Sequence, residues 1–584
     1  MNHQSNQRQQ SLNTLVLSTR PDPRKFAVSA MLGTVLLVTA CGGGENSAAP
    51  QIQAKSALEQ AMAVNAKLSA AGAAHRLNMA TFGATTASVA ELRAMPSYQA
   101  WLEGQIAIPV NRTHWDTLKA IDDANVGFPQ KAFGGRVHSV SIIPVMWQAY
   151  ITAPDQLRKR MGAALLEIFA INERVGAIGY IHNQYSSAGY VDMLERHAFG
   201  NFRDLLEDVA LSPAMGNFLS HIGNQKAAYA NGVEIRVPDE NFARELLQLF
   251  SIGLVKLNAN GTPMLSAGKP IPTYTQEDIF QLARVFTGFN YDTKGEWLER
   301  YRARMVSVPW SHSPEEKRFL GLTIPANTSA KESLKQALDH IFKHPNVGPF
   351  IGKQLIQRLV TSNPSPAYIA RVSAAFANNG KGVRGDMKAV VLAVLTDAEA
   401  TDLTSAALNA DHLGKLREPM MRITAVARAL GASSPGLIFP MGDLTAGKTW
   451  VGQTPVNSPS VFNFFRPGYV PPSSLVAQAG LVAPELQIST GSQIVASINA
   501  VNELIADKQG VFQWTAMANM ERLASDPKAL LDECIVLLTG NGTGLAPRAS
   551  MEAIVAGIPA NEARLRVQTA MQMVASSPAF IVQR

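Results

Sequence analysis

Apolar residues recur at intervals of three and four positions along most of this chain. Between residues 156 and 172, for example, they occupy positions 157, 161, 164, 165, 168 and 169. This spacing places them on one face of an α-helix, which must be buried against another element. Short strands are expected only at 233–237 and 305–308. The pattern therefore predicts a mainly α fold with at most a few short strands.

Helices are expected in both halves of the chain, and no fixed-period repeat indicates a solenoid. We predict them at 54–71, 156–172, 331–343, 346–361, 366–378, 385–397, 413–430, 484–505, 526–538 and 560–576. Three stretches without periodicity, 107–139, 254–274 and 432–480, are expected to be long loops. Such loops are usually functional or packed by their own side chains. The Pro- and Phe-rich piece at 456–472 is expected to pack on the body. We predict one large multi-helical domain at 54–584 with long ordered loops.

The first 40 residues have the order of a secretory signal peptide. Arg24 and Lys25 precede an uncharged apolar run at 26–40, which is too short to span a bilayer comfortably. The run ends in the sequence VTAC, which resembles the lipobox of bacterial lipoproteins, where the cysteine is lipidated and becomes the new N-terminus. We predict that residues 1–40 are removed and that Cys41 carries the lipid. The alternatives are a signal peptide with an incidental cysteine and a buried apolar helix.

Residues 41–53 are predicted to form a lipidated flexible tether. Gly, Ser and Ala dominate their first part, and such a tether lets an anchored domain stand clear of a membrane. The lipobox resemblance implies more than one acyl chain on Cys41, which stable anchoring requires. Gly42 in place of Asp implies the outer membrane, on its periplasmic or surface face. Cys534 then has no disulfide partner, and its apolar surroundings indicate a buried thiol.

The charge of the chain gives little indication of a partner. Charged residues make up 17% and apolar residues 46%, which argues against a disordered chain. Of the net charge of +7, the leader contributes +3 through Arg8, Arg20, Arg24, Lys25 and Asp22, which leaves +4 on the mature chain. So small a charge over this length gives no bulk attraction to nucleic acid or to a membrane surface. We therefore expect no nucleic-acid partner.

A series of short motifs lies in a fixed order between residue 75 and the C-terminus. The most specific is PDENFARELLQLF at 238–250. The others include RLNMATFG at 76–83, LRKR at 157–160, EIF at 167–169, AFGNFRDLL at 198–206, YTQED at 274–278, KLREP at 415–419, PSVFNF at 459–464 and SPAF at 577–580. In this order they resemble the bacterial domain-of-unknown-function family 1800. One departure, Phe289 where that family usually has Trp, keeps an aromatic ring.

The resemblance implies that the protein is exported, but it implies no catalytic activity. Members of the family resemble exported proteins and are often encoded beside a sulfatase-like protein of a family of unknown function numbered 1501. The activity, the substrate and the catalytic residues of the family are not established, so none can be carried over.

Two predicted helices carry polar residues beside their apolar faces. The first is expected to begin near Glu240 with Asp239 as its N-cap, and the second to follow the capping pair Thr275 and Asp278. Fixed guanidinium groups there could line a cleft that binds an anionic ligand bidentately. The candidate cleft residues are Arg158, Arg203, Asn241, Arg244, Glu245, Gln248 and Arg284. The alternative is a buried Arg–Glu network that sets the register of the helices.

Two glycine-rich patterns lack the context that nucleotide binding needs. GDLTAGKT at 442–449 matches the P-loop, but Pro440 interrupts the apolar run before it and Pro455 prevents a normal helix after it. GNGTG at 540–544 is followed by Leu545 instead of the third glycine of a dinucleotide fingerprint. We therefore predict no nucleotide site and no cofactor.

The histidines indicate no metal site. His340 and His344 lie four residues apart near a helix end, but no further ligand accompanies them, so we interpret them as helix-end residues. His197, His312 and Lys317 lie in motif-like segments and are minor candidates. A single histidine near an apolar helix usually just makes a hydrogen bond.

No familiar catalytic arrangement occurs in the sequence. The motifs Glu-x-x-His, His-Glu-x-x-His and Gly-x-Ser-x-Gly are missing, which removes the simplest di-iron, zinc-protease and α/β-hydrolase assignments. We expect an outer-membrane lipoprotein that acts as a binding or assembly partner of an exported protein, such as the sulfatase-like one. The alternative is a cell-envelope hydrolase that acts on an anionic, sulfated or phosphorylated substrate through an Arg/Glu-lined cleft.

Overall fold

A computed structural model describes most of the chain from residue 68 onward. The described residues are 68–110, 112–123, 141–174, 180–404, 412–445, 451–508, 510–540, 545 and 547–584. The leader, Cys41, the tether and most of the helix expected at 54–71 lie outside them. From residue 68 on, the described residues pack into one compact unit.

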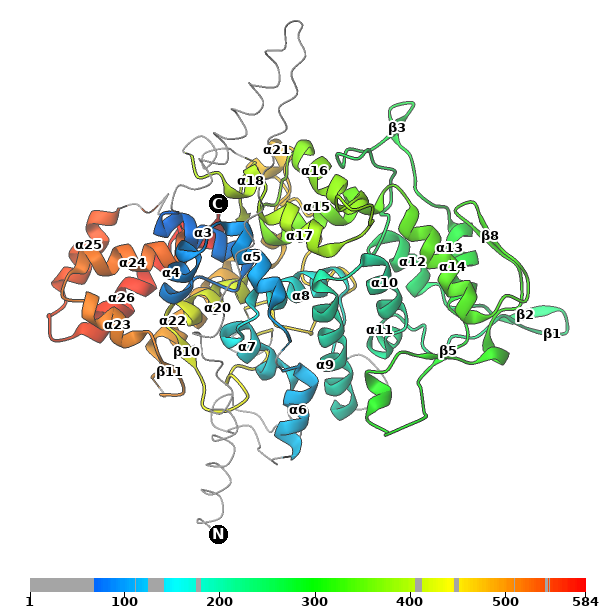
Figure 1. The fold of residues 1–584 in the computed structure, drawn as a ribbon, viewed down its shortest axis with the longest axis horizontal. Helices are drawn as coiled ribbons and strands as arrows, with labels where there is room; N and C mark the ends of the chain where they lie inside the picture. Colours follow the sequence, from blue (N-terminus) through cyan, green and yellow to red (C-terminus); the bar gives the residue numbers. More distant parts are fainter. Residues whose placement is uncertain are drawn as a thin grey trace, which may run out of the picture. The chain divides into compact units, whose positions relative to one another are not determined.

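Helices dominate this unit, as Figure 1 shows, so the prediction of a mainly α fold is confirmed. The α-helices are α3 (Ala70–Ala80), α4 (Thr86–Ala94), α5 (Tyr98–Ala107), α6 (His114–Asp123), α7 (Ile142–Thr152), α8 (Gln156–Ile168), α9 (Tyr180–Arg196), α10 (Phe202–Ala210), α11 (Pro213–Phe218), α12 (Asn241–Gln248), α13 (Gln276–Val285), α14 (Ala330–Lys343), α15 (Val347–Leu359), α16 (Pro366–Ala377), α17 (Met387–Leu395), α18 (Ala398–Thr401), α20 (Pro419–Ala429), α21 (Leu475–Gln478), α22 (Gly491–Ala506), α23 (Met517–Leu523), α24 (Pro527–Thr539), α25 (Arg548–Gly557), α26 (Ala563–Ala575) and α27 (Pro578–Ile581). The 3-10 turns are η1 (His197–Phe199), η2 (Glu299–Tyr301), η3 (Pro309–Ser311) and η5 (Pro484–Ile488).

The strands of the described residues are short and pair only in twos, always antiparallel. The pairs are β1 (Ala228–Ala230) with β2 (Val233–Arg236), β3 (Leu265–Ser266) with β4 (Lys269–Pro270), β5 (Phe289–Asn290) with β6 (Val306–Ser307), β7 (Lys317–Phe319) with β8 (Leu322–Ile324), β9 (Lys415–Leu416) with β12 (Val582–Gln583) and β10 (Ala432–Ser433) with β11 (Gln513–Trp514). Both strands expected from the sequence are confirmed, as β2 and β6.

Most of the expected helices are confirmed with small differences at their ends. They appear as α8, α14, α15, α16, α17, α24 and α26. The capping pair Thr275 and Asp278 is also confirmed, because the two side chains and backbone N–H groups bond reciprocally at the start of α13. The prediction of Asp239 as the N-cap of α12 is wrong, because the helix begins at Asn241, one residue later than expected, and Glu240 holds the N-cap position. The Asp239 side chain still accepts a hydrogen bond of 2.8 Å from the Asn241 N–H.

Two helices begin later than predicted. The helix expected at 413–430 starts at Pro419, because Lys415 and Leu416 pair instead with the C-terminal strand β12 and proline favours the first helical position. The helix expected at 484–505 starts at Gly491, after a capping box formed by Thr490 and Gln493. Both errors come from apolar periodicity that continues across a local start signal.

The stretch 107–139 was expected to be a loop, yet it contains α6. The start of this helix is capped from far along the chain, since the Asp192 carboxylate of α9 accepts the backbone N–H groups of His114 and Trp115 at 2.8 and 3.0 Å. A local start signal is also present, because the Thr113 hydroxyl accepts the Asp116 N–H at 3.0 Å, so the start of the helix combines a local cap with a tertiary one.

Contacts between distant segments join the two ends of the unit. Near the N-terminal end, α3 packs against α24 (Figure 1). The C-terminal strand β12 pairs with β9. Trp147, Phe169 and Phe202 are among the largest fully buried side chains. Val456 and Phe465 are also buried, which confirms that the loop at 456–472 packs on the body.

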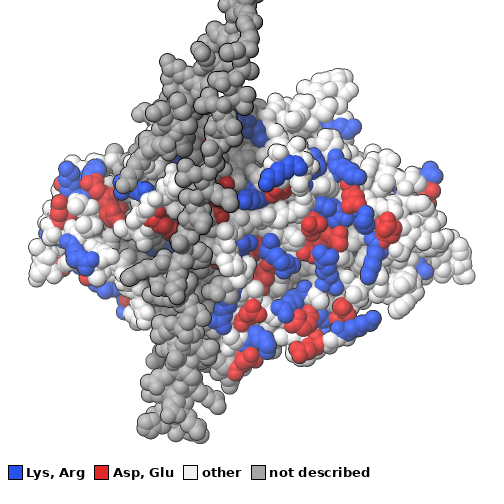
Figure 2. All heavy atoms as spheres, in the orientation of Figure 1, with Lys and Arg blue, Asp and Glu red and all other residues white. Residues whose placement is uncertain are grey.

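The described surface carries charges of both signs. Figure 2 shows basic and acidic side chains interspersed on the face that it draws, which fits the small net charge of the chain. None of the described helices has the length and apolarity needed to cross a membrane.

Candidate functional site

The structure brings together only some of the predicted cleft residues. Asn241, Arg244, Glu245 and Gln248 lie on α12, and Arg244 reaches α13 by bonding the Gln276 side chain at 3.2 Å. Arg244 also pairs with Glu240 at 2.9 Å and stays 38% exposed. Glu245 is buried, and its Oε2 has no hydrogen-bond partner among the described residues. Burial raises the pKa of Glu245 despite the opposing charge of Arg244.

The other three predicted arginines serve separate contacts. Arg158 on α8 donates to the backbone oxygens of Glu195, Ile106 and Ile108. Arg203 on α10 bonds Asp339 at 2.6 Å and Glu207 at 2.8 Å. Arg284 on α13 lies 4.8 Å from the centre of the Phe280 ring and donates to Gln281 and to the Glu316 oxygen. The seven residues therefore belong to different contact sets and line none of the hollows described below.

A larger group of charges meets in the core. It consists of Arg160 and Glu167 of α8, Arg358 of α15, Lys415 of β9, Glu418 before α20, and Glu485 of η5, all buried. We call these six residues the buried charge network. Four of the six lie in segments that carry the motifs of the sequence: LRKR, EIF and KLREP.

Lys415 is the centre of this network. Its ammonium lies 3.3 Å from a Glu418 carboxylate oxygen and 3.2 Å from one of Glu485, and it donates to the Arg358 backbone oxygen at 2.8 Å. The side chain of Lys415 is 2% exposed, and those of the two glutamates are 1% exposed. Removing one partner of such a buried ion pair is costly, because the remaining charge would be buried without an opposite charge and without water.

The pKa values of the neighbouring carboxyl groups Glu167 and Glu418 shift in opposite directions. Burial and the neighbouring Glu418 carboxylate raise the pKa of Glu167 well above its ordinary value. Burial alone would raise the pKa of Glu418 as well, but the Lys415 ammonium and hydrogen bonds from Glu167 and Gln453 outweigh it and lower that pKa. A proton therefore resides on Glu167, as expected when two close carboxyl groups cannot both ionise.

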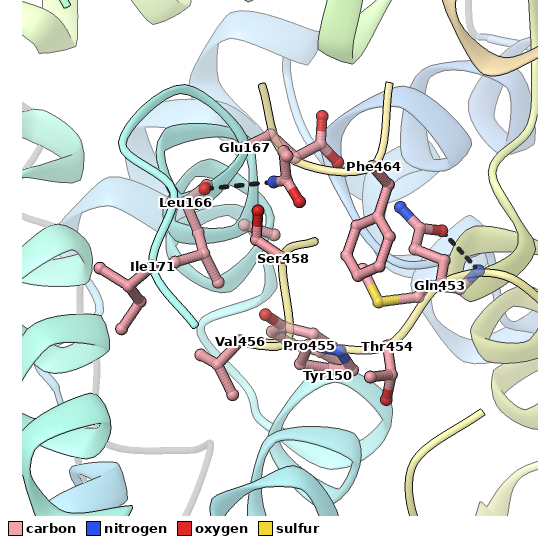
Figure 3. Close-up of a pocket in the computed structure, with 13 residues that line it drawn as sticks. Tyr150, Leu166, Glu167, Ile171, Gln453, Thr454, Pro455, Val456, Ser458 and Phe464 are labelled. Carbon is pink, nitrogen blue, oxygen red and sulfur yellow. Dashed lines mark hydrogen bonds between the residues drawn. The ribbon is translucent and has the colours of Figure 1, made fainter. Parts of the chain in front are cut away.

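A small cavity lies beside Glu167, and Figure 3 shows Tyr150, Gln453 and Phe464 around it. The volume of this cavity is about 20 Å³, which is room for about one water. Two hydrogen bonds close its wall, from Asn463 to the Leu166 oxygen and from the Met420 N–H to Gln453 (Figure 3). A carboxyl group with a raised pKa can serve acid–base catalysis, but no substrate fits here.

A second buried cluster has the ligand types of a metal site. One atom each of His114, Asp192 and Glu195 lie within 4.8 Å of one another. However, the Lys159 ammonium lies 2.5 Å from Glu195, and Asp192 already accepts two backbone N–H groups and the His114 ring at 2.9 Å. The lysine thus supplies the positive charge that balances these carboxylates. The cluster joins α6, α8 and α9.

The minor candidates of the sequence mostly make structural contacts. His340 bonds the Leu320 oxygen at 2.9 Å, whereas His344 accepts from the Asn346 N–H at 3.1 Å, so the two do not share a ligand. The Lys317 ammonium donates to the Ser313 and Glu315 backbone oxygens, and burial lowers its pKa to about 8. Cys534 is buried, as predicted, it is free among the described residues, and burial raises the pKa of its thiol.

The glycine-rich patterns lie partly outside the described residues. Of the P-loop pattern, 442–445 are described, and no strand directly precedes them. Within them, the Asp443 carboxylate accepts hydrogen bonds from the Thr445 hydroxyl at 2.6 Å and from the Asn457 side-chain amide at 3.1 Å. Of 540–544, only Gly540 is described; it ends α24 in the left-handed conformation and packs against His75.

Comparison with known proteins identifies the family. A search of curated proteins and a search of solved structures find no match. The family model described as protein of unknown function (DUF1800) matches residues 75–582. This match spans α3 to β12 and includes every residue of the buried charge network. The chain therefore belongs to the DUF1800 family of proteins of unknown function.

Proposed function

We propose that this chain is a lipid-anchored protein of the bacterial cell envelope that binds and helps assemble an exported partner. The anchor rests on the signal-like leader and on Cys41 at the end of its lipobox. The binding role rests on one surface feature, an apolar hairpin that the rest of the described chain leaves uncovered.

The hairpin formed by β1 and β2 exposes aliphatic side chains. Val233 and Ile235 alternate along β2, so they point to the same side, and Val237 directly follows the strand. The three side chains are 64%, 66% and 58% exposed. All four residues of β2 are exposed. A two-stranded hairpin is only marginally stable by itself. A partner that covers this side would remove the apolar surface from water and stabilise the hairpin.

A tryptophan adjoins the hairpin. Trp310 of η3 is 76% exposed, and the base of the hairpin is tied to the same segment, since the Lys226 N–H donates to the Ser311 oxygen at 2.8 Å. We call Val233, Ile235, Val237 and Trp310 the hairpin surface. Exposed tryptophan beside aliphatic side chains is typical of protein-binding surfaces.

The partner that we propose is an exported protein, such as the sulfatase-like protein that the family resemblance implies. We do not propose a hydrolase that works through the predicted cleft. The arginines named for that cleft bond separate partners, and the cavity beside Glu167 has room for about one water.

The anchor is tested by labelling cells with a radioactive fatty acid. We expect label in the wild-type protein and none after Cys41→Ser, with the unlabelled variant retaining its leader. Equal labelling of the two proteins would overturn the anchor.

The binding role is tested with the purified chain and its sulfatase-like neighbour by isothermal titration. We expect saturable binding that weakens at least tenfold in the triple variant Val233→Ser, Ile235→Ser, Val237→Ser. Ile554→Ser, which changes an aliphatic side chain of similar exposure (54%) on α25, is the matched control and should bind normally. Binding that is absent, or that is equally strong in the triple variant, would contradict the proposal.

A further inference from the structure

A second group of arginines surrounds a hollow at the surface. The hollow has a volume of about 230 Å³, and its lining residues belong to α9, to the end of α10, to the turn before α11 and to the segment after η2. Its wall includes the apolar parts of Tyr190 and Met193, one carboxylate, and three guanidinium groups. We call Arg196, Asp208, Arg302 and Arg304 the arginine pocket.

Arg302 is held by its backbone position and by two neighbours. A Cβ atom at Gly189 of α9 would lie 2.4 Å from the Cβ of Arg302, so only glycine lets this segment approach the helix. The guanidinium group packs 4.4 Å from the centre of the Trp115 ring and bonds Glu299 through two hydrogen bonds of 2.6 and 2.8 Å. This arginine is therefore ordered, with 40% of its side chain exposed.

Asp208 organises the other two arginines. Its carboxylate accepts from His197 at 2.5 Å, from Arg304, and more weakly from Arg196 at 3.4 Å. Burial alone would raise the pKa of Asp208, but the hydrogen bonds from His197 and Arg304 and the charge of Arg304 outweigh it and lower the pKa to about 2. The carboxylate thus stays ionised and satisfied inside the wall.

The arginines keep hydrogen-bond donors that no described residue uses. A guanidinium group has five N–H donors. Arg196 makes only the weak bond to Asp208, and Arg304 bonds Asp208 through Nε and Glu207 through Nη1 at 3.3 Å. Their side chains are 63% and 53% exposed. Both can turn free N–H groups toward a ligand in the hollow.

We propose that the arginine pocket binds a tetrahedral oxyanion, the phosphate or sulfate group of a small ligand. Three guanidinium groups and one satisfied carboxylate line the hollow, whereas Glu299 and Glu207, which pair with Arg302 and Arg304, are not among the lining residues. Guanidinium groups match the oxygens of phosphate and sulfate bidentately. The hollow could hold about seven waters, which is room for an oxyanion and part of the group that carries it. Tyr190 and Met193 would contact that carried group.

This site is independent of the proposed assembly role. The hairpin surface belongs to β2 and η3, and none of its residues lines the arginine pocket. An oxyanion ligand would add a small molecule, or a modified group on the partner, to the proposed functions of the protein.

The test is a titration of the full-length protein in detergent with sodium phosphate, sodium sulfate and sodium chloride at constant ionic strength. We expect phosphate or sulfate to bind saturably and to raise the Tm, and chloride to do neither. The stronger of the two oxyanions identifies the ligand as a phosphate or a sulfate ester. The double variant Arg196→Gln, Arg304→Gln should bind at least tenfold more weakly.

Two controls keep the result interpretable. Arg318→Gln removes an arginine that is 71% exposed and remote from this wall, and it should leave oxyanion binding unchanged. Arg196→Gln alone, at a largely exposed side chain, gives a weakened variant even if the double variant fails to fold by circular dichroism. The proposal is overturned if chloride produces the same effect, or if the arginine variants bind as tightly as Arg318→Gln.

Discussion

The buried charge network and the arginine pocket contain the same kinds of side chain in opposite surroundings. In the network, Lys415 and Glu418 are 2% and 1% exposed, and each charge meets an opposite charge. In the pocket, Arg196 and Arg304 are 63% and 53% exposed and keep unused donors around one satisfied carboxylate. Charges of the first kind hold segments together, whereas charges of the second kind can still exchange water for a ligand.

The difference teaches where function should be sought in this family. Motif residues such as Glu167 and Glu418 resemble catalytic carboxylates, yet the cavity beside Glu167 has room for only about one water. They join α8, α15, β9 and α20, elements that are far apart in the sequence. A conspicuous charged motif can therefore identify the core of a fold, while the binding surface is built from less conspicuous residues.

The largest effect is expected from Glu418→Gln. The change keeps the size of the side chain but removes one of the two carboxylates that lie beside the Lys415 ammonium, which stays buried. Breaking a buried ion pair typically costs about 3–5 kcal/mol of unfolding free energy. Urea unfolding of the variant measures this loss. Glu103→Gln, at an exposed position of α5, is the control, and an equally small loss in both variants would show that the network is not structural.

Asp208→Asn is expected to destabilise less and to affect the pocket instead. Hydrogen bonds to charged groups contribute about 1.5–3 kcal/mol, and Asp208 accepts from His197 and Arg304. The wall also loses its negative charge, so oxyanion binding should tighten. Unfolding and phosphate titration of the same sample measure both effects. If a folded Asp208→Asn variant bound phosphate more weakly than the wild type, the expectation that removing this negative charge favours the oxyanion would be wrong.

Glu167→Gln is expected to change the pH dependence of stability. The raised pKa of Glu167 means that the folded state keeps a proton that the unfolded state loses, so the wild-type protein loses stability as pH rises above about 4.3. The slope from this single group is at most about 1.4 kcal/mol per pH unit. Gln carries no titrating proton and mimics the neutral acid. The variant should therefore gain stability relative to the wild type as pH rises, and parallel unfolding curves from pH 4 to 8 would contradict the raised pKa of Glu167.

The smallest effect is expected from Arg318→Gln. Arg318 pairs with Glu316 at the surface, and exposed ion pairs contribute about 0.2–1 kcal/mol. Thermal unfolding should show little change in Tm, and added salt should reduce the difference further. A loss as large as that of Glu418→Gln would remove the distinction between exposed and buried pairs.

The local sequence predicted most of the helices well. Apolar periodicity and start signals predicted α14, α15, α16 and α24, and the capping pair at Thr275 predicted the start of α13. Prediction was less accurate where distant segments contribute to the start of a helix. For α6 the Asp192 carboxylate of α9 adds to the local cap at Thr113, and the segment before α20 pairs with the C-terminal strand.

The sequence by itself determined the helical class, the family, and the burial of Cys534, because these depend on composition, periodicity and motif order. Only the tertiary structure decided which charges meet. Periodicity shows which face of a helix a residue occupies, but not which distant side chain lies opposite. Lys415 and Glu485 are 70 positions apart and still form an ion pair of 3.2 Å, whereas the arginines predicted for one cleft bond separate partners. Arginines and glutamates that are buried stabilise the core, whereas those that stay exposed can contact a ligand.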